Sequence, residues 1–175
     1  MNTNDAVTNS PLGQGTEYVN SYDPSLLYPI ARHLNWKERG IERNDLPFQG
    51  VDIWNAYELS WINTRGKPEV RLAEFRLYAD SKNIIESKSF KLYLNSFNLS
   101  KFESEKEVEA VLVKDLAAAA GGRVDVRIYH PDQAPEFGQF TGFCIDNQDV
   151  EITQYTPAPE LLFTGEDKVE EVLYS

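Results

Sequence analysis

Cysteine is nearly absent from this sequence, since Cys144 is the only one among 175 residues. A single cysteine excludes an intrachain disulfide, and it is typical of proteins that stay in a reducing compartment. Long apolar runs are also missing, and residues 1–10 lack the apolar core of a signal peptide. These absences predict a soluble, cytoplasmic protein without zinc-finger spacing or a membrane span.

Positive charge is scarce as well. The sequence has 17 Lys and Arg but 28 Asp and Glu, which gives a formal net charge of −11. No run of basic residues forms a local patch, so the chain should repel nucleic acid. We therefore expect no direct nucleic-acid binding. The chain does contain 41% hydrophobic and 12% aromatic residues, which is enough for one folded domain with long ends.

Composition divides the chain into three parts. Residues 1–20 are polar and predict a mobile N-terminal arm, while residues 21–160 contain the apolar patterns of a folded module. Residues 161–175 are acidic, with Val169, Val172 and Leu173 at helical spacing, and they predict the start of a helix leading to a second module. At the start of the module, residues 22–30 contain two prolines and are expected to be extended.

Alternation of apolar and polar residues predicts two strand pairs. Residues 51–61 alternate, and the apolar side of this strand is predicted to be Val51, Ile53, Tyr57, Leu59 and Trp61. Residues 63–68 form a turn, and residues 70–78 return as the second strand. Residues 123–129 predict a further strand with Val124, Val126 and Ile128 inward. Residues 140–145 and 150–155 predict a second hairpin with its turn at 146–149.

Two helices are expected between these strands. The first covers residues 86–98, where an apolar stripe at i, i+3, i+4 and i+7 consists of Phe90, Tyr93, Leu94 and Phe97. The second opens with a capping box, in which Ser104 and Glu107 satisfy each other's free amides, and ends at Gly121. The order β-β-α-α-β-β predicts an α+β fold, with an antiparallel sheet and both helices on one face. The open edges of such a sheet favour pairing with another copy or module.

Residues 84–91 carry the clearest chemical signal. Lys88 and Lys91 fall in the first turns of a helix, where free amides already attract an anion, so they predict a phosphate site. The alternative is that both lysines are simply solvated. Glu86 precedes the same helix, and its carboxylate suits two N–H groups of a guanine-like base. The alternative for Glu86 is an acid that only offsets the helix dipole.

These residues also resemble a known family. Residues 86–91 read Glu-Ser-Lys-Ser-Phe-Lys, which matches the signature hexapeptide of the 7-cyano-7-deazaguanine reductases: Glu, Ser or Leu, Lys, Ser or Ala, a hydrophobic residue, Lys. The continuation over residues 92–97 is similar to that family too. So are Pro11-Leu12-Gly13, Tyr18 and Tyr28-Pro29-Ile30. The N-terminal extension and the acidic tail resemble the tandem form of the family, which has two modules.

The resemblance implies a fold and a reaction. Family members have the tunnelling fold, with two hairpins and two helices per module. They use two NADPH to reduce the nitrile of 7-cyano-7-deazaguanine to a primary amine, giving 7-aminomethyl-7-deazaguanine for queuosine tRNA modification. A Cys thiolate attacks the nitrile carbon to form a thioimide, and an Asp donates a proton. Tandem members are expected to be homodimers.

Site residues follow from the same resemblance. Ile85, Glu86 and Ser87 are expected to bind the substrate, and Ser87, Lys88 and Lys91 to bind NADPH. The catalytic Cys and Asp of the tandem form lie in its second module, so we expect them beyond Ser175 and none in this chain. No Cys stands near Leu46, where a nucleophile-bearing module would have one. Cys144 is instead predicted to be a small buried residue.

Two other functions remain open. The first is a cyclohydrolase-like pterin or purine enzyme of the same fold, which would use Glu86 for the base but normally needs a metal held by His and Cys. The sequence has two His residues, His33 and His130, without ligand-like spacing, and both are expected on the surface or in loops. The second is a non-catalytic assembly module, in which Glu86 would not matter for activity.

Overall fold

A computed structural model of the chain describes residues 21–37, 39–134 and 138–175. The predicted arm over residues 1–20 lies outside the described residues. The chain divides into two compact units, residues 1–134 and residues 135–175. The predicted module over residues 21–160 extends past this division. No helix in the described part of the chain is long and apolar enough to cross a membrane.

The first unit contains the main secondary structure. Its strands are β1 (Pro29–Ala31), β2 (Val51–Ile62), β3 (Pro68–Tyr78), β4 (Asn83–Ile85) and β5 (Val124–Tyr129). Its α-helices are α2 (His33–Lys37), α3 (Ser87–Asn95) and α4 (Glu105–Ala120), and short 3₁₀ turns occur at Pro24–Leu26 and Pro131–Gln133.

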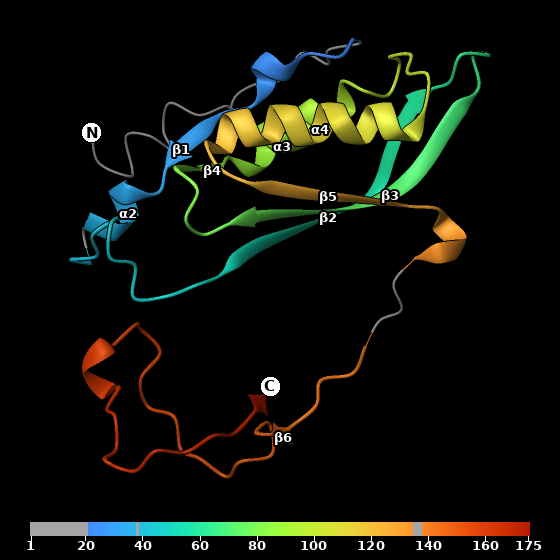
Figure 1. The fold of residues 1–175 in the computed structure, drawn as a ribbon. Coiled ribbons are helices and arrows are strands. Elements are labelled where there is room, and N and C mark those ends of the chain that lie inside the picture. The colour runs from blue at the N-terminus through green and yellow to red at the C-terminus, as the bar shows by residue number, and fades with distance from the viewer. Residues whose placement is uncertain (1–20, 38, 135–137) are drawn as a thin grey trace. The chain divides into compact units, whose positions relative to one another are not determined.

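An antiparallel sheet with the order β2-β3-β5 forms the base of this unit. The helices α3 and α4 lie over one face of that sheet (Figure 1). A separate two-stranded ribbon pairs β1 with β4 in antiparallel register. The predicted α+β class, with an antiparallel sheet and helices on one face, is therefore confirmed at this level.

The core lies between the sheet and the two helices. It is built from apolar side chains that every one of these elements contributes: Leu59, Trp61, Ala73, Phe75, Leu77, Phe90, Tyr93, Phe97, Val108, Leu112, Leu116, Val124 and Val126. The predicted inward side of residues 123–129 is confirmed, because Val124 and Val126 are buried and Ile128 packs against this core.

A β-bulge changes the faces of β2. Ala56 pairs with Ala73 and Leu59 pairs with Arg71, so Tyr57 and Glu58 together oppose one residue of β3. The extra residue reverses which side chains point toward the core in the part of β2 before the bulge. Leu59 and Trp61 are buried as predicted, but the prediction that Val51, Ile53 and Tyr57 point inward is wrong. All three are exposed, and the core side of this half of the strand consists of Trp54 and Ala56.

The two helices begin close to their predicted positions. Helix α3 starts at Ser87 and ends at Asn95, which is shorter than the predicted range 86–98 because Glu86 is its N-cap and Ser96 its C-cap. Helix α4 ends at Ala120 and is capped by Gly121, whose φ of 62° lies in the left-handed region that glycine tolerates.

The capping box at the start of α4 forms only in part. The Ser104 side chain accepts from the Glu107 amide at 3.2 Å, as predicted. The Glu107 carboxylate accepts from the amide of Glu103 at 2.6 Å rather than from that of Ser104. The carboxylate therefore satisfies an amide one residue before the N-cap.

Residues 21–31 run along α3 as a strap. No α-helix forms here, in agreement with the two prolines: Pro24 opens the first 3₁₀ turn and Pro29 opens β1. The amides of Tyr22 and Asp23 donate to the hydroxyls of Ser100 and Ser96 near the end of α3. The amide of Tyr28 donates to Ser89 near its start. The strap is thus held at both ends of the helix.

The second unit differs from its prediction. The hairpin expected over residues 140–145 and 150–155 does not form: only β6 (Phe143–Cys144) is a strand, and it pairs in parallel with β7 (Leu173–Tyr174). The described residues 161–175 contain no α-helix, so the helix expected in the acidic tail is also wrong. Both patterns depended on apolar side chains that are exposed in this unit, among them Phe140, Phe143, Val150, Ile152, Val169 and Val172.

Candidate functional site

The signature residues lie where the β1-β4 ribbon passes into α3. Ile85 is the last residue of β4 and pairs with Pro29. Its side chain is 1% exposed and belongs to the core. A side chain in this place cannot reach a ligand in solution, so a contact between Ile85 and substrate would have to use its backbone.

Glu86 is the N-cap of α3. Its Oε1 accepts from the amide of Lys88 at 2.8 Å, and its Oε2 accepts from the amide of Ser89 at 2.7 Å. The Ser87 hydroxyl lies 3.3 Å from the same Oε1 and donates to it. These are the free amides that every helix N-terminus leaves. The interpretation of Glu86 as a helix-terminal acid is therefore confirmed, while its role toward a base stays a prediction.

The capping role does not use up the acceptor capacity of Glu86. A carboxylate has about four lone-pair sites, and the cap and Ser87 use three of them. The residue is 6% exposed, so little of it is open to solvent. A donor from a ligand would meet a carboxylate that is already fixed in position.

Ser89 is a site residue that sequence patterns did not single out. It is fully buried, its hydroxyl donates to the backbone oxygen of Glu86 at 2.7 Å, and the same hydroxyl accepts from the Tyr28 amide at 3.0 Å. The amide of Glu86 donates to the Tyr28 oxygen at 2.9 Å. Ser89 and the strap therefore hold Glu86 from two sides. The signals in the sequence were its position in the signature hexapeptide and its place in the first helical turn.

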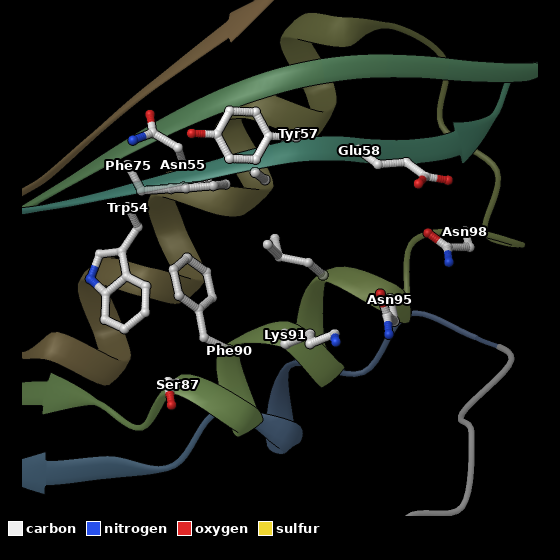
Figure 2. Close-up of a pocket in the computed structure, with 12 residues that line it drawn as sticks. Trp54, Asn55, Tyr57, Glu58, Phe75, Ser87, Phe90, Lys91, Asn95 and Asn98 are labelled. Atoms are coloured by element: carbon white, nitrogen blue, oxygen red, sulfur yellow. The ribbon is translucent and has the colours of Figure 1, made fainter.

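A pocket of about 430 Å³ lies between β2 and α3 (Figure 2). Its lining residues are Trp54, Asn55, Ala56, Tyr57, Glu58, Phe75, Ser87, Phe90, Lys91, Leu94, Asn95 and Asn98. The predicted site residues are thus divided. Ser87 and Lys91 line the pocket, whereas Ile85, Glu86 and Lys88 do not.

Aromatic rings form the inner wall of this pocket. The Trp54 and Phe90 rings meet edge to face at 5.6 Å, and the Phe75 and Phe90 rings do the same at 5.0 Å. The polar side comes from α3, where Ser87, Lys91 and Asn95 follow one another at four-residue spacing. Trp54 was missed from the sequence because regular alternation places it on the outer face of β2. The bulge that reverses this leaves no clear sequence signal.

The two lysines have different surroundings. Lys91 is exposed at the pocket, and the structure gives it no ion pair within the described residues. Lys88 is half-buried, and its amide donates to Glu86. Only Lys91 therefore matches the predicted solvated lysine, and it also lines the pocket.

The other candidate residues are not among those that line this pocket. His33 and His130 are both exposed, as predicted, and His130 lies 3.8 Å from Glu105. Cys144 belongs to the second unit and is half-buried, so its prediction as a fully buried residue is wrong. No group of three or more His, Cys, Asp or Glu side chains with metal-binding geometry occurs in the described part of the chain.

Comparison with known families identifies the fold unit that carries this site. Residues 18–128 match the family model described as "Nitrile reductase, 7-cyano-7-deazaguanine-reductase N-term". The chain belongs to this family. The matched range contains β1 to β4 and all of β5 except Tyr129, and it contains every residue that lines the pocket.

Curated relatives agree with the family match. Three proteins named NADPH-dependent 7-cyano-7-deazaguanine reductase are similar to the chain. The one from Azoarcus sp. (strain BH72) is 51% identical over 168 residues, and the one from Dechloromonas aromatica (strain RCB) is 51% identical over 170. The one from Cupriavidus taiwanensis is 48% identical over 171 residues.

The alignments cover nearly all of this chain but a smaller share of each relative. The alignments cover 95% of this chain but only 60–62% of the length of the three relatives. The chain therefore spans about three fifths of the reductases that it matches, and it is similar to one part of them.

Proposed function

We propose that the chain is the N-terminal part of an NADPH-dependent 7-cyano-7-deazaguanine reductase of the queuosine pathway. The observation that carries this proposal is the identity of 48–51% over 95% of the chain to proteins of that name. The reaction is the reduction of the nitrile to 7-aminomethyl-7-deazaguanine by two NADPH. A second module is proposed to supply the nucleophilic Cys and the proton-donating Asp.

The first role of this chain is to hold the substrate base. Glu86 is proposed to accept hydrogen bonds from the base, together with Ser87 and the backbone of Ile85. Two features support this role: the carboxylate is fixed by the helix amides and by the Ser89–Tyr28 contacts, and it retains acceptor capacity. A fixed acceptor loses little entropy when a ligand binds.

The second role is to contact the cofactor through Ser87, Lys88 and Lys91. The chain's own residues fit a phosphate group, because Lys91 is an exposed cation without an ion pair in the described structure and Ser87 lines the same pocket. When bound, NADPH supplies hydride to the substrate. Lys91 and Ser87 hold and orient its phosphate, which fixes the position of the attached rings.

The remaining parts of the proposal concern assembly. We infer the tunnelling fold, in which the sheet β2-β3-β5 is completed by a second module or another copy. The exposed Val51, Ile53, Tyr57 and Val70 on β2 and β3 are consistent with such a cover. The active enzyme is proposed to be a cytoplasmic homodimer, with residues 161–175 leading into the second module.

The test of this proposal is NADPH oxidation in the presence of 7-cyano-7-deazaguanine. The chain is assayed alone and mixed with a separately produced second module. Turnover only in the mixture is expected. Turnover by the chain alone would contradict a divided site, and it would make Cys144 the residue to examine. A mixture that forms a complex but does not oxidise NADPH would favour an assembly module.

Glu86 offers a sharper test through two variants. Glu86→Ala removes both the cap and the base contact, while Glu86→Asp keeps a good N-cap but withdraws the carboxylate by one methylene. Both variants should raise the KM for substrate about 10- to 100-fold, because a charge-assisted hydrogen bond contributes about 1.5–3 kcal/mol. Only Glu86→Ala should also lower the free energy of unfolding, by about 1 kcal/mol. Normal substrate affinity in Glu86→Asp would show that Glu86 is a cap and nothing more.

A further inference from the structure

The second unit of the chain leaves its apolar side chains open to solvent. None of the described residues 138–175 is buried, although most of the exposed large apolar side chains in the described chain belong to this range. The most exposed of them are Phe163 at 93%, Tyr155 at 87% and Leu162 at 84%. A single exposed apolar residue is ordinary, but a whole segment of them marks a surface that another protein covers.

This unit nevertheless has a shape that its own contacts define. Strands β6 and β7 pair in parallel, so the two ends of the segment lie together and residues 145–172 form a closed loop between them. The rings of Phe140 and Tyr174 stack at 5.8 Å beside this ladder. Gly142 permits the pairing, because a Cβ atom there would clash with the carbonyl oxygen of Val172. The loop therefore presents its apolar side chains from a defined base.

Negative charge limits what can cover this surface. Residues 138–175 contain eight Asp and Glu but a single Lys, so they carry a net charge of −7 out of the −11 of the chain. A covering protein must therefore combine an apolar face with positive charge. A second copy of this chain fits poorly, because the remainder of the chain is negatively charged as well.

The relatives indicate where such a covering protein comes from. The N-terminal family model ends at residue 128, so it leaves out the whole second unit. The alignments with the reductases cover 95% of the chain, and they must therefore include most of residues 138–175. The segment is thus shared with proteins in which about two fifths of the length lies outside the match.

We propose that residues 138–175 are a docking surface for the second module of the reductase, which covers them with a basic, apolar face. Tyr155, Leu162 and Phe163 are buried in this contact, and the carboxylates of the segment pair with Lys and Arg side chains of the module. Since the proposed function supplies the second module, the docking surface rests on that function. It names the residues of this chain that hold the two parts together, which differ from those that bind ligands.

Hydrogen exchange tests whether this surface is covered in a complete enzyme. The full-length Azoarcus reductase is compared with this chain. The part that aligns with residues 138–175 should exchange rapidly in the chain and more than about 10-fold more slowly in the full-length protein, because docking orders its backbone and excludes water. Equally rapid exchange in both proteins would overturn the docking surface.

Calorimetric binding of the separately produced second module to the chain tests individual side chains. The double variant Leu162→Ser, Phe163→Ser should weaken this binding about 10- to 100-fold, because two apolar anchors leave the contact. Leu99→Ser is the matched control and should leave binding unchanged, since Leu99 is 63% exposed in the first unit. All three side chains are exposed, so both variants should keep the parent's circular dichroism spectrum.

The same titration at two salt concentrations tests the charge of the partner. Raising NaCl from about 0.05 M to about 0.5 M should weaken binding about 10-fold, because salt screens the attraction between acidic segment and basic module. Glu170→Gln with Glu171→Gln should reduce this dependence on salt. Glu42→Gln with Glu103→Gln should not, because these two exposed acids belong to the first unit. Binding that salt leaves unchanged would overturn the basic face.

Further results separate the docking surface from the reductase activity. Absence of binding would overturn the docking surface, as would equal affinities of Leu99→Ser and the Leu162, Phe163 double variant, or self-association of the chain through these two residues. If the mixture of chain and module nevertheless reduces the nitrile, the proposed function stands alone. If binding behaves as expected but the mixture reduces no nitrile, the docking surface stands and the reductase proposal fails.

Discussion

At the scale of single residues, Asp115 does most to join separate parts of the first unit. It lies on α4, is 9% exposed, and accepts at Oδ2 from the hydroxyls of Tyr22 and of Tyr93, the latter at 2.8 Å. Tyr22 belongs to the strap and Tyr93 to α3. Buried carboxylates are costly unless they are hydrogen-bonded, and here two phenols provide those bonds. One acidic side chain therefore ties the strap to both helices.

This cluster predicts a loss of stability at alkaline pH. Burial, and then the hydrogen bonds to Asp115, raise the pKa of Tyr22 and that of Tyr93 well above the usual value of 10.0. Since the folded-state pKa is raised, the stabilisation is complete below pH 10 and is lost as the pH rises above it. Urea unfolding at pH 8 and pH 11 should show a lower free energy of unfolding at pH 11.

The control for this prediction is the double variant Tyr22→Phe, Tyr93→Phe. It should be less stable at pH 8, because Asp115 loses both donors, at a cost of about 1–3 kcal/mol. Its free energy of unfolding should change less than that of the parent between pH 8 and pH 11. An equal change in both proteins would assign the alkaline effect to other groups.

At the scale of elements, the predictability of each strand and helix depended on whether its pattern was regular. Helix α4 was predicted almost to the residue, because Ser104 and Gly121 mark its ends and its apolar spacing is uniform. Strand β2 was located well but its faces were not, because the bulge at Tyr57 and Glu58 reverses the alternation. Alternation assigns a face only as long as every residue keeps its place in the ladder.

Deleting Glu58 tests this account of β2. Without the extra residue, regular alternation from Leu59 backward turns Tyr57 outward and keeps Ala56 and Trp54 on the core side. The free energy of unfolding should therefore stay within about 1 kcal/mol of the parent's, because only an exposed side chain is lost. Thermal unfolding measures this effect. A loss of about 2–4 kcal/mol, as expected when a large side chain leaves a core, would show that the bulge is needed to hold Trp54 in place.

At the scale of the whole molecule, the two units differ in how much apolar surface they bury. The buried core consists of residues from Ile30 to Val126, all within the first unit. Residues 138–175 expose large apolar side chains and form only the two-residue strands β6 and β7 and a 3₁₀ turn at Pro159–Leu161. The failed predictions cluster there for a physical reason. Alternating residues in 140–155 indicate a strand only when a core exists to receive their apolar side.

In the candidate site too, residues were recognised from the sequence where their role depends on neighbouring residues, and missed where it depends on distant ones. Residues Glu86, Ser87 and Lys91 were found from the sequence because a helix start and its charges are local features. Trp54 and Ser89 were not, because Trp54 reaches the pocket only through the bulge in a distant strand, and Ser89 acts through the strap residue Tyr28. Contacts that join segments 30 or more residues apart leave no trace in periodicity.

A truncation tests the independence of the first unit. A chain ending at Ala134 retains every residue of the core cluster and of the pocket. We expect it to unfold cooperatively within about 1 kcal/mol of the full chain, since a segment that buries little apolar surface contributes little stability. Circular dichroism during urea unfolding provides the comparison. Loss of the cooperative transition would show that residues 135–175 complete the fold.

The double duty of Glu86 limits how this site can change over evolutionary time. Glu86 directly follows the last strand of the ribbon, and its carboxylate caps the N-terminus of α3. Under the proposed function, the same carboxylate selects the base. A mutation that relaxes base selection also removes the anchor from which the helix begins. New specificity at this position would therefore need a compensating cap elsewhere before the glutamate could be replaced. The site should thus diversify around Glu86, through pocket residues such as Asn95 and Asn98, long before the glutamate itself is lost.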